Sequence, residues 1–170
     1  MITKVDRNYL EINSPGEIKV SNKPNKDCKI EIKNPPDFQI NKFFYKQIGK
    51  SYRWIDRLVW DDSTWMNYTN NSNLETYILS ENGDLIGFFE LLFHTGTRKC
   101  EVAYIGILHE YIGKNYGKYL LAEALKLGFR KNTKKVWLHT CSLDHKHALK
   151  NYLSRGMQIF KSETIDVDIN

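Results

Sequence analysis

A short basic turn between two glycines is the part of this sequence that could most clearly do chemistry. It lies where an apolar, strand-like run gives way to a helix, and it consists of Gly113, Lys114, Asn115, Tyr116, Gly117 and Lys118. The first turn of a helix presents N–H groups without intrahelical partners and the positive end of the helix dipole, so such a turn can bind a phosphate group. Glycine lets the backbone approach an anion closely, and asparagine tolerates a left-handed conformation. The spacing of the glycines alone is equally consistent with an ordinary strand-to-helix connection, in which glycine serves only to turn the chain.

Positive charge is concentrated around this turn. The 170 residues carry 25 Lys or Arg and 20 Asp or Glu side chains, for a net charge of +5. Residues 114–155 hold ten of the basic and only two of the acidic side chains, a local charge of +8, which leaves −3 for the rest. The distribution indicates that the basic region meets an anion. The turn matches neither the G-x-x-x-x-G-K-[ST] nor the G-x-G-x-x-G nucleotide-binding pattern.

Hydrophobic periodicity predicts the elements that position the turn. Strands are predicted at residues 75–79, 85–93, 101–108, 136–141 and 157–167, with Asn82-Gly83 as a hairpin turn. Helices are predicted as two short segments within about 41–66, broken near Gly49 and Ser51, then at 117–130 and over a segment that ends at Gly156. The run 85–93 is apolar on both faces except at Glu90, which predicts a central strand. Strands that alternate with helices predict an α/β fold around a mixed sheet.

Length and composition suit one soluble domain. A hydrophobic fraction of 41% with 26% charged residues is ordinary for a globular protein and argues against disorder or a coiled coil. Residues 1–170 are expected to form one domain, in which residues 1–40 supply an N-terminal edge element and the first strand. The longest apolar stretch, residues 102–108, is far shorter than the roughly 20 residues that span a bilayer. Because the start of the chain has no apolar signal segment, a cytoplasmic protein is expected.

Cysteine and histidine do not indicate a metal site. The three cysteines are odd in number and lack C-x-x-C spacing, so reduced thiols are expected. His139 and Cys141 could share one face of a strand, but His145 and His147, two residues apart, would not share a helix face. The sequence therefore predicts no metal.

The strand, turn and helix at residues 101–125 resemble the coenzyme A loop of the GNAT superfamily of N-acetyltransferases, whose pattern is Q/R-x-x-G-x-G/A. The later segment WLHTCSLDHKHALKNYLSRGM resembles the strand, helix and Gly-Phe ending that follow in that superfamily. Ile112 stands where Gln or Arg is usual, Asn115 where Gly is usual and Met157 where Phe is usual, whereas Gly117 fits. WLHTCSLDH is similar to a bacterial subgroup in which an aliphatic residue also precedes the glycine loop. The resemblance implies a single domain of GNAT fold, a mixed central sheet flanked by helices.

The resemblance also implies that acetyl-CoA is the acetyl donor. Its pyrophosphate would lie on backbone N–H groups of residues 113–118, and its pantetheine would lie along the strand at Ile105, Gly106 and Ile107. A splayed strand there would leave backbone groups free to pair with pantetheine amides, and an N–H near Ile107 could polarise the thioester carbonyl. Gly106 would ease that distortion. A plain core strand would explain the apolar residues equally well, but not the adjoining basic turn.

Acyl transfer to an amine needs a proton acceptor, because an ammonium group has no lone pair. Glu101, sixteen residues before the final glycine of the loop, resembles the strand glutamate that acts as base in the histone-modifying branch of the superfamily. Glu90 is the rival, since burial in an apolar strand would make its carboxylate a stronger proton acceptor. Either could instead be a structural carboxylate, and a chain of waters could serve. Tyr152 resembles the superfamily's tyrosine in the pattern A-x-x-x-Y-x-x-x-G and would protonate the departing thiolate, with a core tyrosine as the alternative.

The expected activity is therefore acetyl-CoA-dependent N-acetylation of a primary amine by direct attack. Trp54, Arg57 and Trp60 could shape the pocket for the acceptor, a small molecule or a peptide, although such aromatic residues also form cores. A nucleic-acid-binding module is an alternative from another class of protein. It is suggested by the charge of +8 in residues 114–155 and by the 13% aromatic content. A CoA-binding regulator without turnover is a third. The sequence indicates no membrane partner, and it leaves the acceptor and the oligomeric state open.

Overall fold

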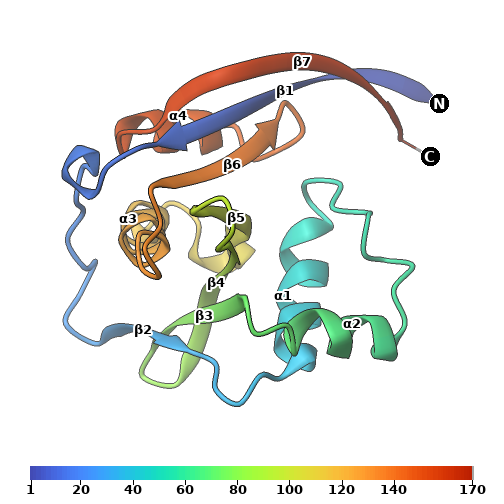
Figure 1. The fold of residues 1–170 in the computed structure, drawn as a ribbon. Helices are drawn as coiled ribbons and strands as arrows, with labels where there is room; N and C mark the ends of the chain where they lie inside the picture. The colour runs from blue at the N-terminus through green and yellow to red at the C-terminus, as the bar shows by residue number, and fades with distance from the viewer. Residues whose placement is uncertain (170) are drawn as a thin grey trace.

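A mixed sheet of seven strands forms the centre of the fold. The computed structural model describes residues 1–169, and Figure 1 shows their course. The strands are β1 (Ile2–Ile12), β2 (Cys28–Ile32), β3 (Leu74–Glu81), β4 (Asp84–His94), β5 (Lys99–Ile107), β6 (Lys135–Cys141) and β7 (Gln158–Asp168). Their order in the sheet is β2-β3-β4-β5-β6-β1-β7, with β5 and β6 parallel and the other neighbours antiparallel. This sheet confirms the predicted α/β fold.

Helices cover both faces of the sheet. In residues 1–169 they are α1 (Phe38–Gly49), α2 (Asp62–Thr69), α3 (Tyr116–Gly128) and α4 (Ala148–Ser154), with short 3-10 turns at Pro15–Glu17 and His109–Tyr111. Figure 1 shows α1 and α2 on one side of the central strands and α3 on the other. The carboxylates of Asp37 and Asp61 cap α1 and α2 by accepting hydrogen bonds from backbone N–H groups of the first turn. The two predicted N-terminal helices are confirmed, but the break between them extends over residues 50–61.

β4 is the central strand that its apolar sequence predicts. Phe88 stacks on Phe44 of α1, with ring centroids 4.9 Å apart, whereas the next residue, Phe89, stacks on Tyr77 at 4.9 Å in the core beneath α3. Both phenylalanines are fully buried, because successive residues of a strand point to opposite faces and both faces are covered. The predicted hairpin turn at Asn82-Gly83 leads into this strand, and both of its residues have the positive φ that a tight hairpin turn needs.

The N-terminal strand does not lie at the edge of the sheet, which corrects the expectation for residues 1–40. β1 lies between β6 and β7 and pairs with both, whereas β2 is the edge strand next to β3. Pairing with β7 explains why β1 begins at Ile2, because main-chain hydrogen bonds to β7 hold its polar first half, residues 2–6, whereas β6 pairs only with residues 7–12. Local alternation identifies a strand but says nothing about its neighbours.

The cysteines are free thiols, as predicted. Cys28 and Cys100 are buried, and Cys141 is partly exposed. The helices found in residues 1–169 are all too short or too polar to cross a membrane.

Candidate active site

A cavity opens where β5 and β6 diverge. These two strands pair only between Lys99–Glu101 and Lys135–Trp137, although both continue beyond that point. A cavity of about 840 Å³ fills the gap, lined on one side by residues 102–107 of β5 and on the other by Leu138, His139 and Cys141 of β6. The edge of β5 that faces β6 therefore carries main-chain groups without a strand partner. This divergence matches the splayed strand that the resemblance implies.

The basic turn at the start of α3 leaves its N–H groups unpaired. Asn115 is the N-cap residue and has the left-handed conformation expected of it, with φ at 68°, and its side chain forms no capping hydrogen bond. Gly113 has φ at 82°, a conformation that favours glycine. Among the turn and loop hydrogen bonds of residues 1–169, none has an N–H of residues 113–118 as donor. These N–H groups, at the positive end of the α3 dipole, are available to an anion.

The side chains of the turn divide into two groups. Those that line the cavity are Gly113, Asn115, Gly117 and Lys118. Tyr116 instead points into the core, where it is 6% exposed and its hydroxyl donates a hydrogen bond to Glu81 at 3.0 Å. The ammonium of Lys114 lies 5.8 Å from the ring centroid of Tyr111. Of the predicted cofactor contacts, Tyr116 and Lys114 can therefore contribute their backbone but not side chains directed into the cavity.

The predicted pantetheine strand lines the cavity at each of its three residues, Ile105, Gly106 and Ile107. One edge of this strand pairs with β4, where Gly106 lies opposite Phe88. The structure shows a steric reason for glycine at position 106, because a Cβ there would lie 2.8 Å from Cγ2 of Ile48 in α1. Glycine is needed because α1 packs directly on the strand, and a larger residue would displace either the helix or the strand.

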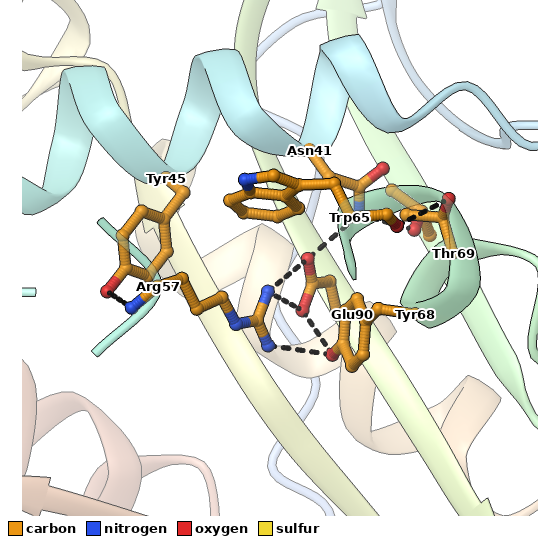
Figure 2. A network of polar contacts seen from close by, with 8 residues as sticks. Asn41, Tyr45, Arg57, Trp65, Tyr68, Thr69 and Glu90 are labelled. Carbon is orange, nitrogen blue, oxygen red and sulfur yellow. Dashed lines mark hydrogen bonds and ion pairs between the residues drawn. The ribbon is translucent and has the colours of Figure 1, made fainter. Parts of the chain in front are cut away.

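Arg57 and Glu90 form the centre of a buried polar network on the α1 side of the sheet (Figure 2). Nη1 of Arg57 lies 3.0 Å from one carboxylate oxygen of Glu90 and 3.1 Å from the other. The Tyr68 hydroxyl donates to Glu90 at 2.7 Å, and the Asn41 amide donates at 2.8 Å. Five rings surround the guanidinium at 4.2 to 5.6 Å, those of Tyr45, Trp60, Trp65, Tyr68 and Tyr104.

This network corrects two expectations. Glu90 is fully buried and is not one of the cavity-lining residues in 1–169, so it cannot reach a substrate to accept its proton. Arg57 is 7% exposed and paired with Glu90, and within the described chain neither it nor Trp60 lines the cavity. Trp54 is the predicted acceptor residue that does line it. Arg57 and Glu90 bind each other, and this contact holds the segment 50–61 against the sheet.

Glu101 lies at the last paired position of β5, beside the point of divergence. Burial raises the pKa of its carboxyl, against the opposing effect of His94, whose Nε2 lies 3.8 Å from the carboxylate. Glu101 is not among the described residues that line the cavity. Its role as general base stays a prediction, and it would need a route for the proton out of the cavity.

α4 supplies a tyrosine and positive charge to the cavity. Tyr152 lines it, and burial raises the pKa of its hydroxyl, so the group stays protonated at neutral pH. A protonated hydroxyl is what a proton donor requires. Lys150 and Arg155, on α4 and just after it, line the same wall and add cations that the sequence analysis did not single out.

The rest of the cavity lining, away from α4, comes largely from residues that the sequence did not indicate. β1 contributes Val5 and Arg7, the segment 50–61 contributes Asp56, and β6 contributes His139, which the sequence suggested only as a possible metal ligand. No pattern in the sequence indicated that β1 lies beside β6, because this position depends on pairing across more than 120 residues. No group of three His, Cys, Asp or Glu side chains that could hold a metal ion occurs in residues 1–169.

The chain matches one family model over most of its length. The model describes the acetyltransferase (GNAT) family and matches residues 39–157. This range includes β3 to β6, the basic turn and α4, and it leaves out β1, β2 and β7. No curated protein matches the chain.

Several solved structures share the fold. A GCN5-related N-acetyltransferase from Kribbella flavida has a TM-score of 0.67 at 15% identity, over 97% of this chain and 58% of that one. A GCN5-related N-acetyltransferase from Sphaerobacter thermophilus has a TM-score of 0.68 at 14% identity, over 95% of this chain and 51% of that one. An aminoglycoside acetyltransferase from an uncultured soil metagenomic sample, solved in complex with trehalose, has a TM-score of 0.65 at 13% identity, over 78% of this chain and 90% of that one. The chain thus spans little more than half the length of the first two.

Proposed function

The chain belongs to the acetyltransferase (GNAT) family, and from that premise we propose that it transfers an acetyl group from acetyl-CoA to a primary amine by direct attack. The observation that carries the proposal is the continuous path from the unpaired N–H groups at the start of α3 to the open edge of β5. An anion and an extended chain can occupy this path together, as a nucleotide thioester requires.

The residues of the cavity suit acetyl-CoA. Its pyrophosphate would be held by the N–H groups of residues 113–118, with Lys118, Lys150 and Arg155 adding positive charge. Its pantetheine would lie along residues 105–107, whose free edge can pair with amide groups. The donor supplies an activated acyl group, and the backbone near Ile107 would polarise its carbonyl. Tyr152 would give its proton to the departing thiolate.

The acceptor would enter from the other half of the cavity, between Trp54 and the β1 wall. A primary amine, small or at the end of a peptide, is the proposed class, because acetyl transfer needs a nucleophile with a lone pair. One structural neighbour is an aminoglycoside acetyltransferase, so amino sugars belong in the first panel of acceptors.

Two measurements test the proposal. Isothermal titration with acetyl-CoA should show micromolar binding, and release of free thiol should follow when an amine is added. Absence of any acetyl-CoA affinity would reject the proposal. Binding without turnover across the amine panel would indicate a CoA-binding regulator, and salt-dependent binding of an oligonucleotide without CoA affinity would indicate a nucleic-acid-binding module.

A further inference from the structure

The acceptor half of the cavity contains an imidazole and a carboxylate from two different walls. His139 projects from β6, and Asp56 projects from the segment between α1 and α2; both line the cavity. Burial has the largest effect on the pKa of His139, and Asp56 is one of the carboxylates whose charge opposes that effect. Within residues 1–169 the Asp56 carboxylate has no hydrogen bond or ion pair, so it is free to meet a cation.

We propose that His139 accepts the proton of the acceptor's ammonium group and that Asp56 binds this ammonium across the cavity. The proposal rests on the acetyl transfer proposed above and assigns its proton acceptor. A general base must reach the proton it takes, directly or through one water. His139 meets this requirement by lining the cavity, whereas Glu90 is enclosed by its own network and Glu101 pairs with His94 outside the cavity wall.

The surroundings of His139 favour a neutral imidazole. On β1 its cross-strand partner is Tyr9, whose ring centroid lies 5.6 Å away. The residue is exposed, but partial burial of its ring, together with the Arg7 guanidinium, lowers the pKa of His139 from its ordinary value of 6.5. The titratable and charged groups around it are Arg7 and Tyr9 of β1, Asp56, Cys141, Asp144 and Glu163 of β7. The three carboxylates oppose the shift without reversing it, so the ring offers a free lone pair at pH 7.

The proton balance of the reaction is complete with these groups. One proton passes from the ammonium to a ring nitrogen of His139, which later releases it to solvent. The freed lone pair forms the C–N bond to the thioester carbonyl carbon, and the C–S bond breaks. The departing thiolate takes the proton of Tyr152. The nitrogen loses a second proton when the tetrahedral intermediate collapses to the amide, and this proton restores the tyrosine. The products are an amide, a thiol and one proton.

The kinetic test compares His139→Gln with His109→Gln, because His109 is exposed and is not one of the described residues that line the cavity. The acceptors used are spermidine, tyramine, lysine and glucosamine, with thiol release as the assay. His139→Gln should lower kcat/KM by about 10²- to 10⁴-fold at pH 7 and remove the acid limb of the wild-type pH profile. It should leave the Kd for acetyl-CoA within about twofold, and His109→Gln should change none of these. A profile unchanged in His139→Gln but lost in Glu101→Gln would overturn the proposal and make Glu101 the base.

A second measurement does not depend on turnover. In protein labelled with ¹³C at histidine Cε1, His139 should titrate below 6.5, and Asp56→Asn should lower its midpoint further because a nearby negative charge is removed. A midpoint above 6.5, or one that Asp56→Asn does not move, would refute the placement of these two residues in one site. If acetyl-CoA failed to bind at all, the proposed function would fail first, and calorimetry would show this separately.

Discussion

The buried ion pair of Arg57 and Glu90 leads us to predict a loss of stability whose magnitude follows from the structure. Replacing Glu90 with Gln keeps the volume but removes the charge that the guanidinium faces, and it turns one acceptor oxygen into a donor. Arg57 and Asn41 donate toward that position, so the variant leaves buried donors without acceptors. Breaking one side of a buried pair costs about 3 to 5 kcal/mol. For a chain of this length, that loss corresponds to a fall in Tm of roughly 6 to 20 °C.

The assay is thermal and urea unfolding of Glu90→Gln, Arg57→Met and the double variant. The loss of unfolding free energy in the double variant should be smaller than the sum of the losses in the two single variants, by about 2 kcal/mol or more. The reason is that each single change leaves the other charge unpaired. Glu123→Gln is the matched control, since Glu123 pairs with Lys126 at 2.9 Å on the surface of α3 and should lose less than about 0.5 kcal/mol.

Two outcomes would refute this reasoning. Single effects that add to within about 0.5 kcal/mol would mean that the pair is not coupled. A Glu90→Gln variant of normal stability with abolished turnover would mean that Glu90 acts in catalysis after all. We expect acetyl-CoA affinity to stay near the wild-type value in folded Glu90→Gln, because the network lies on the α1 side of the sheet and its residues form no part of the basic turn.

Three further predictions concern the cavity. Lys118→Glu should weaken acetyl-CoA binding by at least about tenfold in calorimetry, since one attractive contact to phosphate becomes repulsive. The control is Lys46→Glu, because Lys46 is an exposed residue of α1 outside the described cavity lining. An equal loss of affinity in the control would contradict a local effect. Tyr152→Phe should lower kcat and leave the acetyl-CoA Kd unchanged. Because burial raises the pKa of Tyr152, wild-type activity should show no loss from ionisation of this tyrosine between about pH 7 and 9. A fall in wild-type activity in that range that is absent from Tyr152→Phe would contradict the donor role. Gly106→Ala should cost about 1 to 3 kcal/mol in urea unfolding, because the new Cβ would lie 2.8 Å from Ile48; an unchanged midpoint would mean that α1 is free to move.

Much of the fold follows from short-range rules and could be predicted from the sequence. The apolar run of β4 and the Asn82-Gly83 turn specify a central strand and a hairpin through contacts close in sequence. The same holds for the glycines and basic residues before α3, because the conformation of a helix start depends on only a few neighbouring residues. These features led to the predicted anion site and to the family, of which the family model confirms the second.

The acceptor half of the cavity could not be predicted in this way. β1 lies beside β6 only because strands more than 120 residues apart pair with each other, and this pairing brings Arg7 and Tyr9 next to His139. Glu90 and Arg57, considered as separate residues, were both candidates for chemistry. Their contact, decided by how α1 and the segment 50–61 pack on the sheet, joins them in a buried ion pair, whereas Asp56 and His139 line the cavity. The sequence by itself determined most of the helices and strands and led to the proposed donor site, since these depend on short-range propensity. Side-chain access to the cavity depended on long-range packing and was decided by the tertiary structure alone.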